Sequence, residues 1–410
     1  MTYRYIGRQP IIDIRAKIVA YDLLYRENEV KNNSNLTVAV ISNLLDALSI
    51  ETILGKNIGF LRVDSEFFEY DIIHSLPKDK IICALLADTL IDEILLERLL
   101  LLKKDGYQFA LSDCLYNSKT AENFFPLLPF IYYLKIDVTQ SDLSLVKKNL
   151  SLFHSYGIKL IGTKIETHEM YELCRSIGFD YFQGYFISEP NIIKNAVLSP
   201  EYEGIIRLWN LLQHDTEIPE LVDAFQSNQG LSIKLLHFIN SAAFSLRNPV
   251  SSIDHLLRLM GRNPLAQWIM LMMFTEEAKS SNARVPLVLM VINRTELMSG
   301  LLTLIKPTAT REEKSTAYFV GMLSLIHLLF HMPQKEVLTR LNISPAIEQA
   351  LFTGEGIFGE ILNLVRSIEI FDIESIEAYL KTKGLTYTHI QPLINQSMEK
   401  VNAFEKEMEG

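Results

Sequence analysis

The sequence is poor in cysteine and contains no cluster of basic residues. Its three cysteines, an odd number without a C-x-x-C pair, exclude a disulfide framework and indicate a reducing compartment. Lys and Arg number 39 against 49 Asp and Glu, so the net charge is −10. A protein that binds nucleic acid by neutralising phosphates is therefore not expected.

The sequence also lacks long apolar runs. The longest that we recognise, residues 268–274 and 320–330, fall well short of the ~18 residues that cross a bilayer. The first residues, MTYRYIGRQP, contain no apolar core of a signal peptide. We therefore expect a soluble cytoplasmic protein without a membrane partner, and 410 residues are enough for two or three domains.

The first half of the chain alternates strand and helix patterns. Two apolar runs within residues 8–26, separated by Arg15-Ala16-Lys17, predict two consecutive strands. Further strand patterns occupy 58–63, 80–86, 107–111, 130–136, 159–165 and 181–187, with helical patterns at 37–54, 91–103 and 142–156. Eight strands, the later ones roughly 25 residues apart, predict an α/β fold of TIM-like (β/α) barrel type, in which chemistry lies at the strand C-termini.

Several motifs occur on these strands in a fixed order. They are Gln9-Pro10-Ile11, Asp22-Leu23-Leu24 followed by Arg26, Leu134-Lys135-Ile136-Asp137, residues 157–167, and Gln183-Gly184-Tyr185-Phe186 before Pro190. Together, over about residues 8–190, they resemble the EAL domain family of cyclic di-GMP phosphodiesterases. The resemblance implies a two-metal hydrolytic site, in which Lys135 would help to deprotonate the attacking water and Gln183 would support the site.

The metal ligands that the resemblance implies are largely replaced. Arg62 stands where the family has Asn, Ala84 and Thr163 stand where it has Glu, and Ser112 replaces the first Asp of a pair. Asp22 takes the place of the Glu in the family's signature. Two divalent cations need several converging carboxylates and amides, so we expect a degenerate metal site, no cofactor and no catalysis.

The residues that survive form a possible vestigial nucleotide pocket: Gln9, Asp22, Arg26, Asp113, Lys135, Glu166 and Gln183. We prefer the interpretation that ion pairs close the barrel top, with Lys135 paired to Glu166, and Arg62 to Asp22 or Glu166. Arg26 keeps nucleotide binding open, because arginine suits bidentate phosphate contacts. Cyclic di-GMP is thus a possible ligand but not the favoured one.

The second half reads as helical after a linker at 190–200. Helical patterns occupy 202–212, 231–245, 256–260 and 265–274, with a capping box at 251–254 and Gly261 as a terminator. The motifs around Asn240-Ser241-Ala242, Leu259-Met260-Gly261 and 321–326 resemble the HDOD domain over about residues 203–381. This resemblance implies an all-helical, HD-like module that generally lacks a metal site. His214-Asp215 and the pair His327 and His331 do not make an HD site.

We therefore expect three segments: a degenerate EAL domain at 1–199, an HDOD domain at 200–393 and a C-terminal tail at 394–410. The function expected is that of a non-catalytic signal-transduction adaptor of the EAL-HDOD type, in or near cyclic di-GMP signalling. Its partners would be proteins, bound through the HDOD domain. The alternatives are a cyclic di-GMP phosphodiesterase and a cyclic di-GMP receptor.

Overall fold

The chain divides into two compact units. The structure, a computed structural model, describes residues 4–27, 50–69, 71–184, 200–214, 216–226, 252–280, 285–330, 332–341 and 343–409. Unit 1 comprises Met1–Glu189 together with Leu364–Gly410, and unit 2 comprises Pro190–Asn363. The end of the chain therefore belongs with its beginning.

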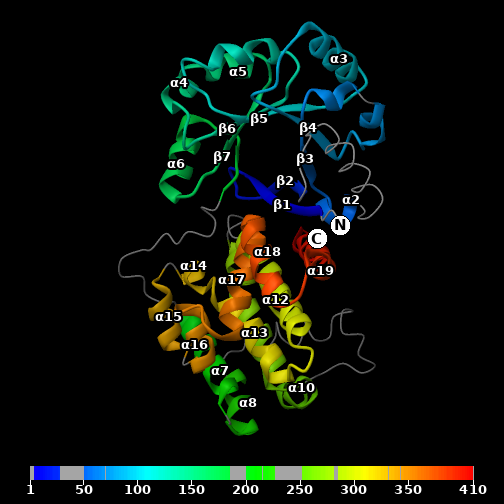
Figure 1. The fold of residues 1–410 in the computed structure, drawn as a ribbon. Helices are drawn as coiled ribbons and strands as arrows, with labels where there is room; N and C mark the ends of the chain where they lie inside the picture. The colour runs from blue at the N-terminus through cyan, green and yellow to red at the C-terminus, as the bar shows by residue number, and fades with distance from the viewer. Residues whose placement is uncertain are drawn as a thin grey trace. The chain divides into compact units, whose positions relative to one another are not determined.

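Unit 1 is built on a closed barrel of eight strands, as the sequence predicts (Figure 1). The strands are β1 Arg4–Asp13, β2 Ile18–Glu27, β3 Ile58–Val63, β4 Ile81–Leu86, β5 Phe109–Cys114, β6 Tyr133–Asp137, β7 Lys159–Thr163 and β8 Tyr181–Phe182. From β2 to β8 all neighbours are parallel, whereas β1 is antiparallel to both β2 and β8. The barrel thus departs from an all-parallel TIM barrel at one strand.

The reversal of β1 follows from the short turn that joins it to β2. One oxygen of the Asp13 carboxylate accepts hydrogen bonds from the backbone N–H groups of Arg15 and Lys17, at 2.8 and 2.9 Å. Ala16 takes a left-handed conformation with φ of 56°. Parallel strands need a crossover of about a dozen residues or more, so a turn this short permits only an antiparallel pair.

Alternation along the strands divides the barrel interior into an apolar part and a polar part. The apolar part is a buried cluster of small and branched side chains around one aromatic ring: Ile11, Ala20, Phe60, Ile82, Ala84, Ala110 and Ile161. Asp22 lies two residues beyond Ala20 on β2, and Arg62 lies two residues beyond Phe60 on β3. Lys135 on β6 and Gln183 after β8 are also buried in this polar part of the interior. The polar residues therefore gather where β2 to β8 end.

Short helices alternate with the parallel strands. They are α2 Ile50–Leu54, α3 Glu93–Lys104, α4 Leu143–Lys148, α5 Leu150–Ser155 and α6 His168–Ile177. The predicted helix at 91–103 is confirmed as α3. The one at 142–156 is split at Asn149, after a start that Asp142 caps by accepting from the N–H groups of Ser144 and Leu145. Of the pattern at 37–54, only α2 lies within the described residues.

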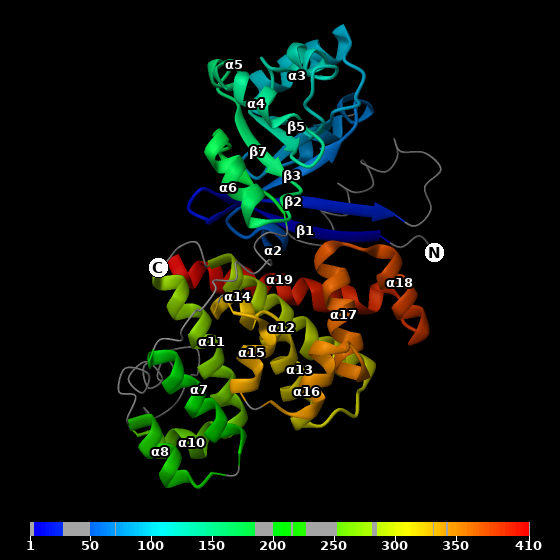
Figure 2. The same cartoon turned by 90° about the vertical axis from the view of Figure 1, so that its left-hand side faces the viewer.

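The last two helices, α18 Ile373–Thr382 and α19 Tyr387–Glu409, belong to unit 1. Helix α19 packs against α2 and the outer face of β1, as Figure 2 shows. It buries one apolar stripe: Tyr387, Ile390, Ile394, Met398 and Val401.

Polar contacts fix α19 on the barrel. The Arg8 guanidinium donates to the Asn402 side chain at 2.8 Å and to the carbonyls of Ile53 and Met398. It also stacks on the Tyr21 ring, 4.3 Å from the centroid. Near the end of the helix, Asn57 donates to the buried Glu405 at 3.0 Å. The structure therefore divides the chain differently from the expected limits at 199 and 393: residues 394–409 form a packed helix rather than a tail.

Unit 2 is all-helical within its described residues. Its helices are α7 Pro200–Gln213, α8 Ile218–Gln226, α10 Ile253–Met260, α11 Arg262–Ser280, α12 Val285–Ile305, α13 Arg311–Leu323, α14 Ile326–Phe330, α15 Gln334–Arg340, α16 Pro345–Phe352 and the first part of α17 Gly356–Ile370. Ser252 caps α10 by accepting from the N–H of His255, and Gly261 ends it. The predicted helix at 231–245 and the linker at 190–200 lie outside the described residues, apart from Pro200 at the start of α7.

Helix α12 is the one described helix that is long and apolar enough to cross a membrane, and the sequence analysis did not assign it. Half of its most apolar stretch is buried inside the structure. Arg294 in its middle is also buried and donates to the Ser324 hydroxyl at 2.7 Å. A helix with these buried residues contributes to the core of unit 2.

Candidate functional site

The strand ends of the barrel bring together six of the residues singled out from the sequence. A buried carboxylate, Asp22 on β2, is at the centre, and its side chain is 0% exposed. Lys135 on β6 approaches one of its oxygens with a 2.6 Å Nζ–Oδ1 distance. Arg62 on β3 lies 3.4 Å from the other oxygen and 3.3 Å from the Asp113 carboxylate on β5. Two cations and two anions thus form one chain of ion pairs.

Gln183, directly after β8, completes this cluster through hydrogen bonds. Its Nε2 donates to Gln9 Oε1 at 2.7 Å and to Asp22 Oδ2 at 3.1 Å. The position of Gln183 depends on the next residue, because Gly184 has φ of 156° and a Cβ there would lie 2.0 Å from the Ile165 carbonyl oxygen. Only glycine permits this approach of the β8 end to the segment after β7.

Burial and pairing set the protonation states of the central pair. Burial raises the pKa of the Asp22 carboxyl, but Lys135 and Arg62 outweigh this effect, and the pKa lies below its ordinary value of 3.8. Burial lowers the pKa of the Lys135 ammonium from 10.5, although Asp22 acts in the opposite direction. At neutral pH Asp22 is therefore the counter-ion of the cations around it rather than a proton acceptor.

The cluster lies at the strand ends of the barrel, where the resemblance stated above would place divalent cations. Both carboxylates already face cations of the protein, and the Arg62 guanidinium lies between them. Two acids and two bases give the cluster no net charge with which to attract a dication. Nor do the described residues contain a group of three or more His, Cys, Asp or Glu side chains that could hold a metal ion. Asp22 and Asp113 are the two carboxylates of this cluster, and each is already paired with a cation of the protein.

The three residues expected from the resemblance to replace metal ligands, Ala84, Ser112 and Thr163, are on β4, β5 and β7. Ala84 is opposite Arg62 in the register of β4 and β3, and it is completely buried. Thr163, at the end of β7, donates to the Ile136 carbonyl. Ser112 on β5 is buried, and its hydroxyl has no hydrogen-bond partner among the residues that the structure describes. None of the three supplies a carboxylate.

The structure does not place two of the predicted site residues, Glu166 and Arg26, in this cluster. Glu166 lies beyond the end of β7 and is exposed, and the partner of Lys135 is Asp22 rather than Glu166, so that predicted ion pair is wrong. Ile165, between Lys164 and Glu166, is buried and its N–H donates to the Gln183 carbonyl at 3.1 Å, whereas the next side chain, that of Glu166, faces solvent. Arg26 is on β2, but its side chain lies outside what the structure describes.

Two features of the site were not predicted. Asp113 has a left-handed backbone with φ of 56°, next to an irregularity in the pairing of β5 with β6. Such strain persists where the surroundings impose it, often at functional sites. Lys164 pairs with the buried Asp137 at 2.7 Å. Burial raises the pKa of Asp137, but hydrogen bonds from Lys164 and Thr139 lower it below 3.8.

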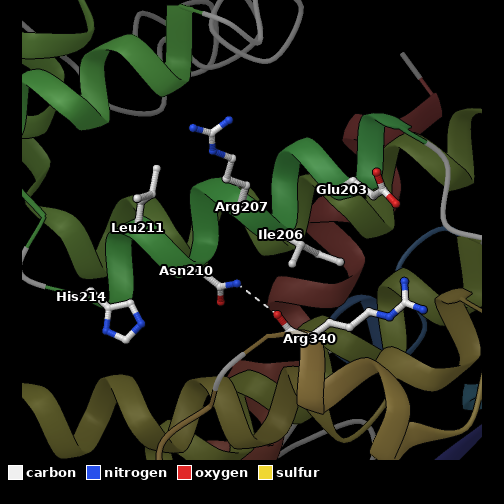
Figure 3. Close-up of a pocket in the computed structure, with 7 residues that line it drawn as sticks. All are labelled: Glu203, Ile206, Arg207, Asn210, Leu211, His214 and Arg340. Atoms are coloured by element: carbon white, nitrogen blue, oxygen red, sulfur yellow. Dashed lines mark hydrogen bonds between the residues drawn. The ribbon is translucent and has the colours of Figure 1, made fainter.

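A second candidate is a groove of about 390 Å³ on unit 2, between α7 and the end of α15 (Figure 3). It is lined by apolar and charged side chains: Glu203, Ile206, Arg207, Asn210, Leu211, His214 and Arg340. Asn210 donates to the Arg340 carbonyl at 3.0 Å, and its own amide oxygen meets no hydrogen-bond partner within the described part of the chain. Glu203 and His214 are the lining side chains of this groove that can exchange a proton near neutral pH.

Two family models match the chain. Residues 71–190 match the EAL domain, and residues 202–342 match the HDOD domain. The first lies in unit 1 apart from its last residue, and the second lies in unit 2.

Two curated relatives match over nearly the whole chain. The uncharacterized protein YuxH of Bacillus subtilis is 27% identical, over 89% of this chain and 90% of its own length. The cyclic di-GMP phosphodiesterase CdgJ of Vibrio cholerae is 24% identical, over 93% of this chain and 88% of its own. Among solved structures, the EAL domain of Mycobacterium smegmatis DcpA is 20% identical and covers 46% of this chain and 92% of its own, with a TM-score of 0.38.

Proposed function

Because this chain joins an EAL domain to an HDOD domain, we propose that it is a non-catalytic member of this signalling family. It acts as an adaptor through protein–protein contacts made by the helical unit, in or near cyclic di-GMP signalling. Its place is the cytoplasm, and it needs no cofactor.

One observation carries the proposal: the Lys135–Asp22–Arg62–Asp113 chain of ion pairs at the barrel strand ends. A phosphodiesterase of this fold would use metal-bound water as its nucleophile. In this protein the side-chain cations occupy the carboxylates that would hold the metals. The buried pair remains useful for structure, since it fixes the ends of β2 and β6 to one another.

The competing function is that of a cyclic di-GMP phosphodiesterase, which is what the Vibrio cholerae relative is called. A receptor that binds the nucleotide without cleaving it is the third class. Gln9, Asp22, Lys135 and Gln183 would line either site, with Arg26 as the phosphate ligand. The cluster disfavours both functions, because any dication or ligand must first displace Arg62 from two carboxylates.

The purified chain is expected not to hydrolyse cyclic di-GMP with Mg²⁺ or Mn²⁺. The reason is the loss of carboxylate ligands at Ala84 and Thr163 and the presence of Arg62 in place of a neutral amide. Appearance of linear dinucleotide is measured by chromatography, with CdgJ as the positive control.

The control variant is Asp22→Ala, which removes the central carboxylate. Product formed in proportion to the wild-type chain and lost in Asp22→Ala would contradict the proposal. Equal traces of product from both proteins would instead indicate a contaminating enzyme.

A further inference from the structure

Helix α3 leaves a group of large aliphatic side chains on the surface of unit 1. Ile94 is 76% exposed, Leu101 54% and Leu100 44%, and Leu90 just before the helix is 78% exposed. The opposite face packs on the barrel through Leu95, Leu99 and Leu102. A single exposed leucine is ordinary, whereas four large aliphatic side chains exposed on one helix and its entry are unusual for a surface in contact with water alone.

The charges of α3 change sign along its length. Glu93 is in the first turn, whereas Lys103 and Lys104 are in the last turn. Ile94 and Leu101 are seven residues apart, which is about two turns, so they lie on nearly the same side of the helix. Two copies of such a helix that pack antiparallel would therefore place the acidic end of each beside the basic end of the other.

We propose that α3 is a self-association surface that pairs antiparallel with α3 of a second copy of this chain. A two-fold axis between Glu97 and Arg98 places Ile94 of each copy against Leu101 of the other. The same axis places Glu93 within one turn of Lys104 in the other copy, on the same flank of the interface. An isologous pair of this kind closes as a dimer.

This dimer contains one unfavourable contact, between the two Glu97 side chains, that distinguishes it from other modes of association. Glu97 lies on the flank of Glu93 and Lys104, next to the axis, so the Glu97 side chains of the two copies approach each other. Like charges facing one another destabilise a helix pair slightly. Replacing Glu97 should therefore strengthen the dimer, which a nonspecific apolar association would not predict.

The most direct test uses a Glu97→Cys variant of the full chain under mild oxidation. The three native cysteines are 0 or 1% exposed, so the new thiol is the one at the surface among described residues. A disulfide-linked dimer on a non-reducing gel is expected. The matched control is Glu172→Cys on α6, a residue whose side chain is 47% exposed. Equal cross-linking of both variants, or none, would overturn the proposal.

The second test measures mass in solution by sedimentation velocity, at concentrations up to about 200 μM, because a contact this small gives a weak dimer. Wild-type chain should dimerise, Ile94→Glu should be monomeric, and Leu173→Glu, at a site 46% exposed on α6, should behave as wild type. Glu97→Ala should lower the dissociation constant roughly twofold.

Charge reversal tests the direction of the pair. Glu93→Lys should weaken the dimer, and adding Lys104→Glu should restore it. A wild-type chain that stays monomeric throughout would overturn the proposal, as would a dimer that Ile94→Glu leaves intact.

Discussion

Replacing Lys135 with methionine is expected to destabilise the barrel by about 3 kcal/mol. Lys135 and Asp22 are 1% and 0% exposed, and their 2.6 Å pair is the shortest contact of the cluster. Methionine retains the length of the side chain but leaves the Asp22 carboxylate buried with only Arg62 and Gln183 as partners. The loss of stability is measured by hydrogen exchange of barrel peptides, with urea as denaturant.

The matched control is the double variant Lys135→Met with Asp22→Leu. Removing both charges should cost less than removing one, because no uncompensated carboxylate remains. Both tryptophans, Trp209 and Trp268, lie in unit 2, so tryptophan fluorescence follows that unit and should not change. A single variant as stable as wild type would show that the pair does not hold the strand ends.

The pH dependence of the wild-type chain follows from the same cluster. The folded pKa of Asp22 is below its ordinary value of 3.8, so its contribution to stability is complete above that pH. The contribution is lost as the pH falls below 3.8 and through the folded pKa. The free energy of unfolding of the barrel should therefore fall less steeply with decreasing pH below 3.8 in the double variant, which lacks this carboxyl.

A chain that ends at residue 384 is expected to lose the folded barrel, although it keeps every strand. The deletion removes α19, which packs against α2 and supplies the partners of Arg8 and Asn57 on the barrel. A buried polar or charged group that loses its partner costs about 1–3 kcal/mol, so losing several such contacts together with the packing on α2 is of the same order as the whole stability of a domain, about 5–15 kcal/mol. Hydrogen exchange should find the barrel amides unprotected.

Point variants separate packing from chain length. Ile394→Ala should cost about 3 kcal/mol, as is usual for a buried isoleucine, and Gln396→Ala on the exposed side of α19 should change stability by less than about 0.5 kcal/mol. A shortened chain with normal barrel protection would mean that the barrel folds without α19, as the expected C-terminal tail at 394–410 would imply.

Local patterns predicted the barrel well because each strand carries its own evidence. The run at 58–63 matches β3, and the polar turn Arg15-Ala16-Lys17 gave the β1–β2 hairpin. The place of α19 could not be predicted in this way. Its stripe of Ile394, Met398 and Val401 shows that a face is buried, but periodicity does not say against which part of the chain.

The sequence predicted which residues gather at the strand ends better than it predicted which of them form ion pairs. Asp22, Lys135 and Gln183 come together because parallel strands end at the same edge of a barrel. The partner of Lys135 could not be predicted in this way. The Glu166 side chain after β7 is exposed, whereas Asp22 on β2 is buried and lies 2.6 Å from the Lys135 ammonium. Which of two acids a buried lysine meets depends on tertiary packing, and local sequence patterns do not report it.

The most direct measurement of the central claim is a calorimetric titration of the chain with cyclic di-GMP, with and without Mg²⁺. A barrel whose strand ends are closed by Lys135, Asp22 and Arg62 predicts no binding heat and no rise in melting temperature. One site with a Kd of about 1 μM would add about 2.7 kcal/mol at about 100 μM ligand, so an interaction would be visible in both. A one-site isotherm that Arg26→Ala abolishes would contradict the account and establish a nucleotide receptor.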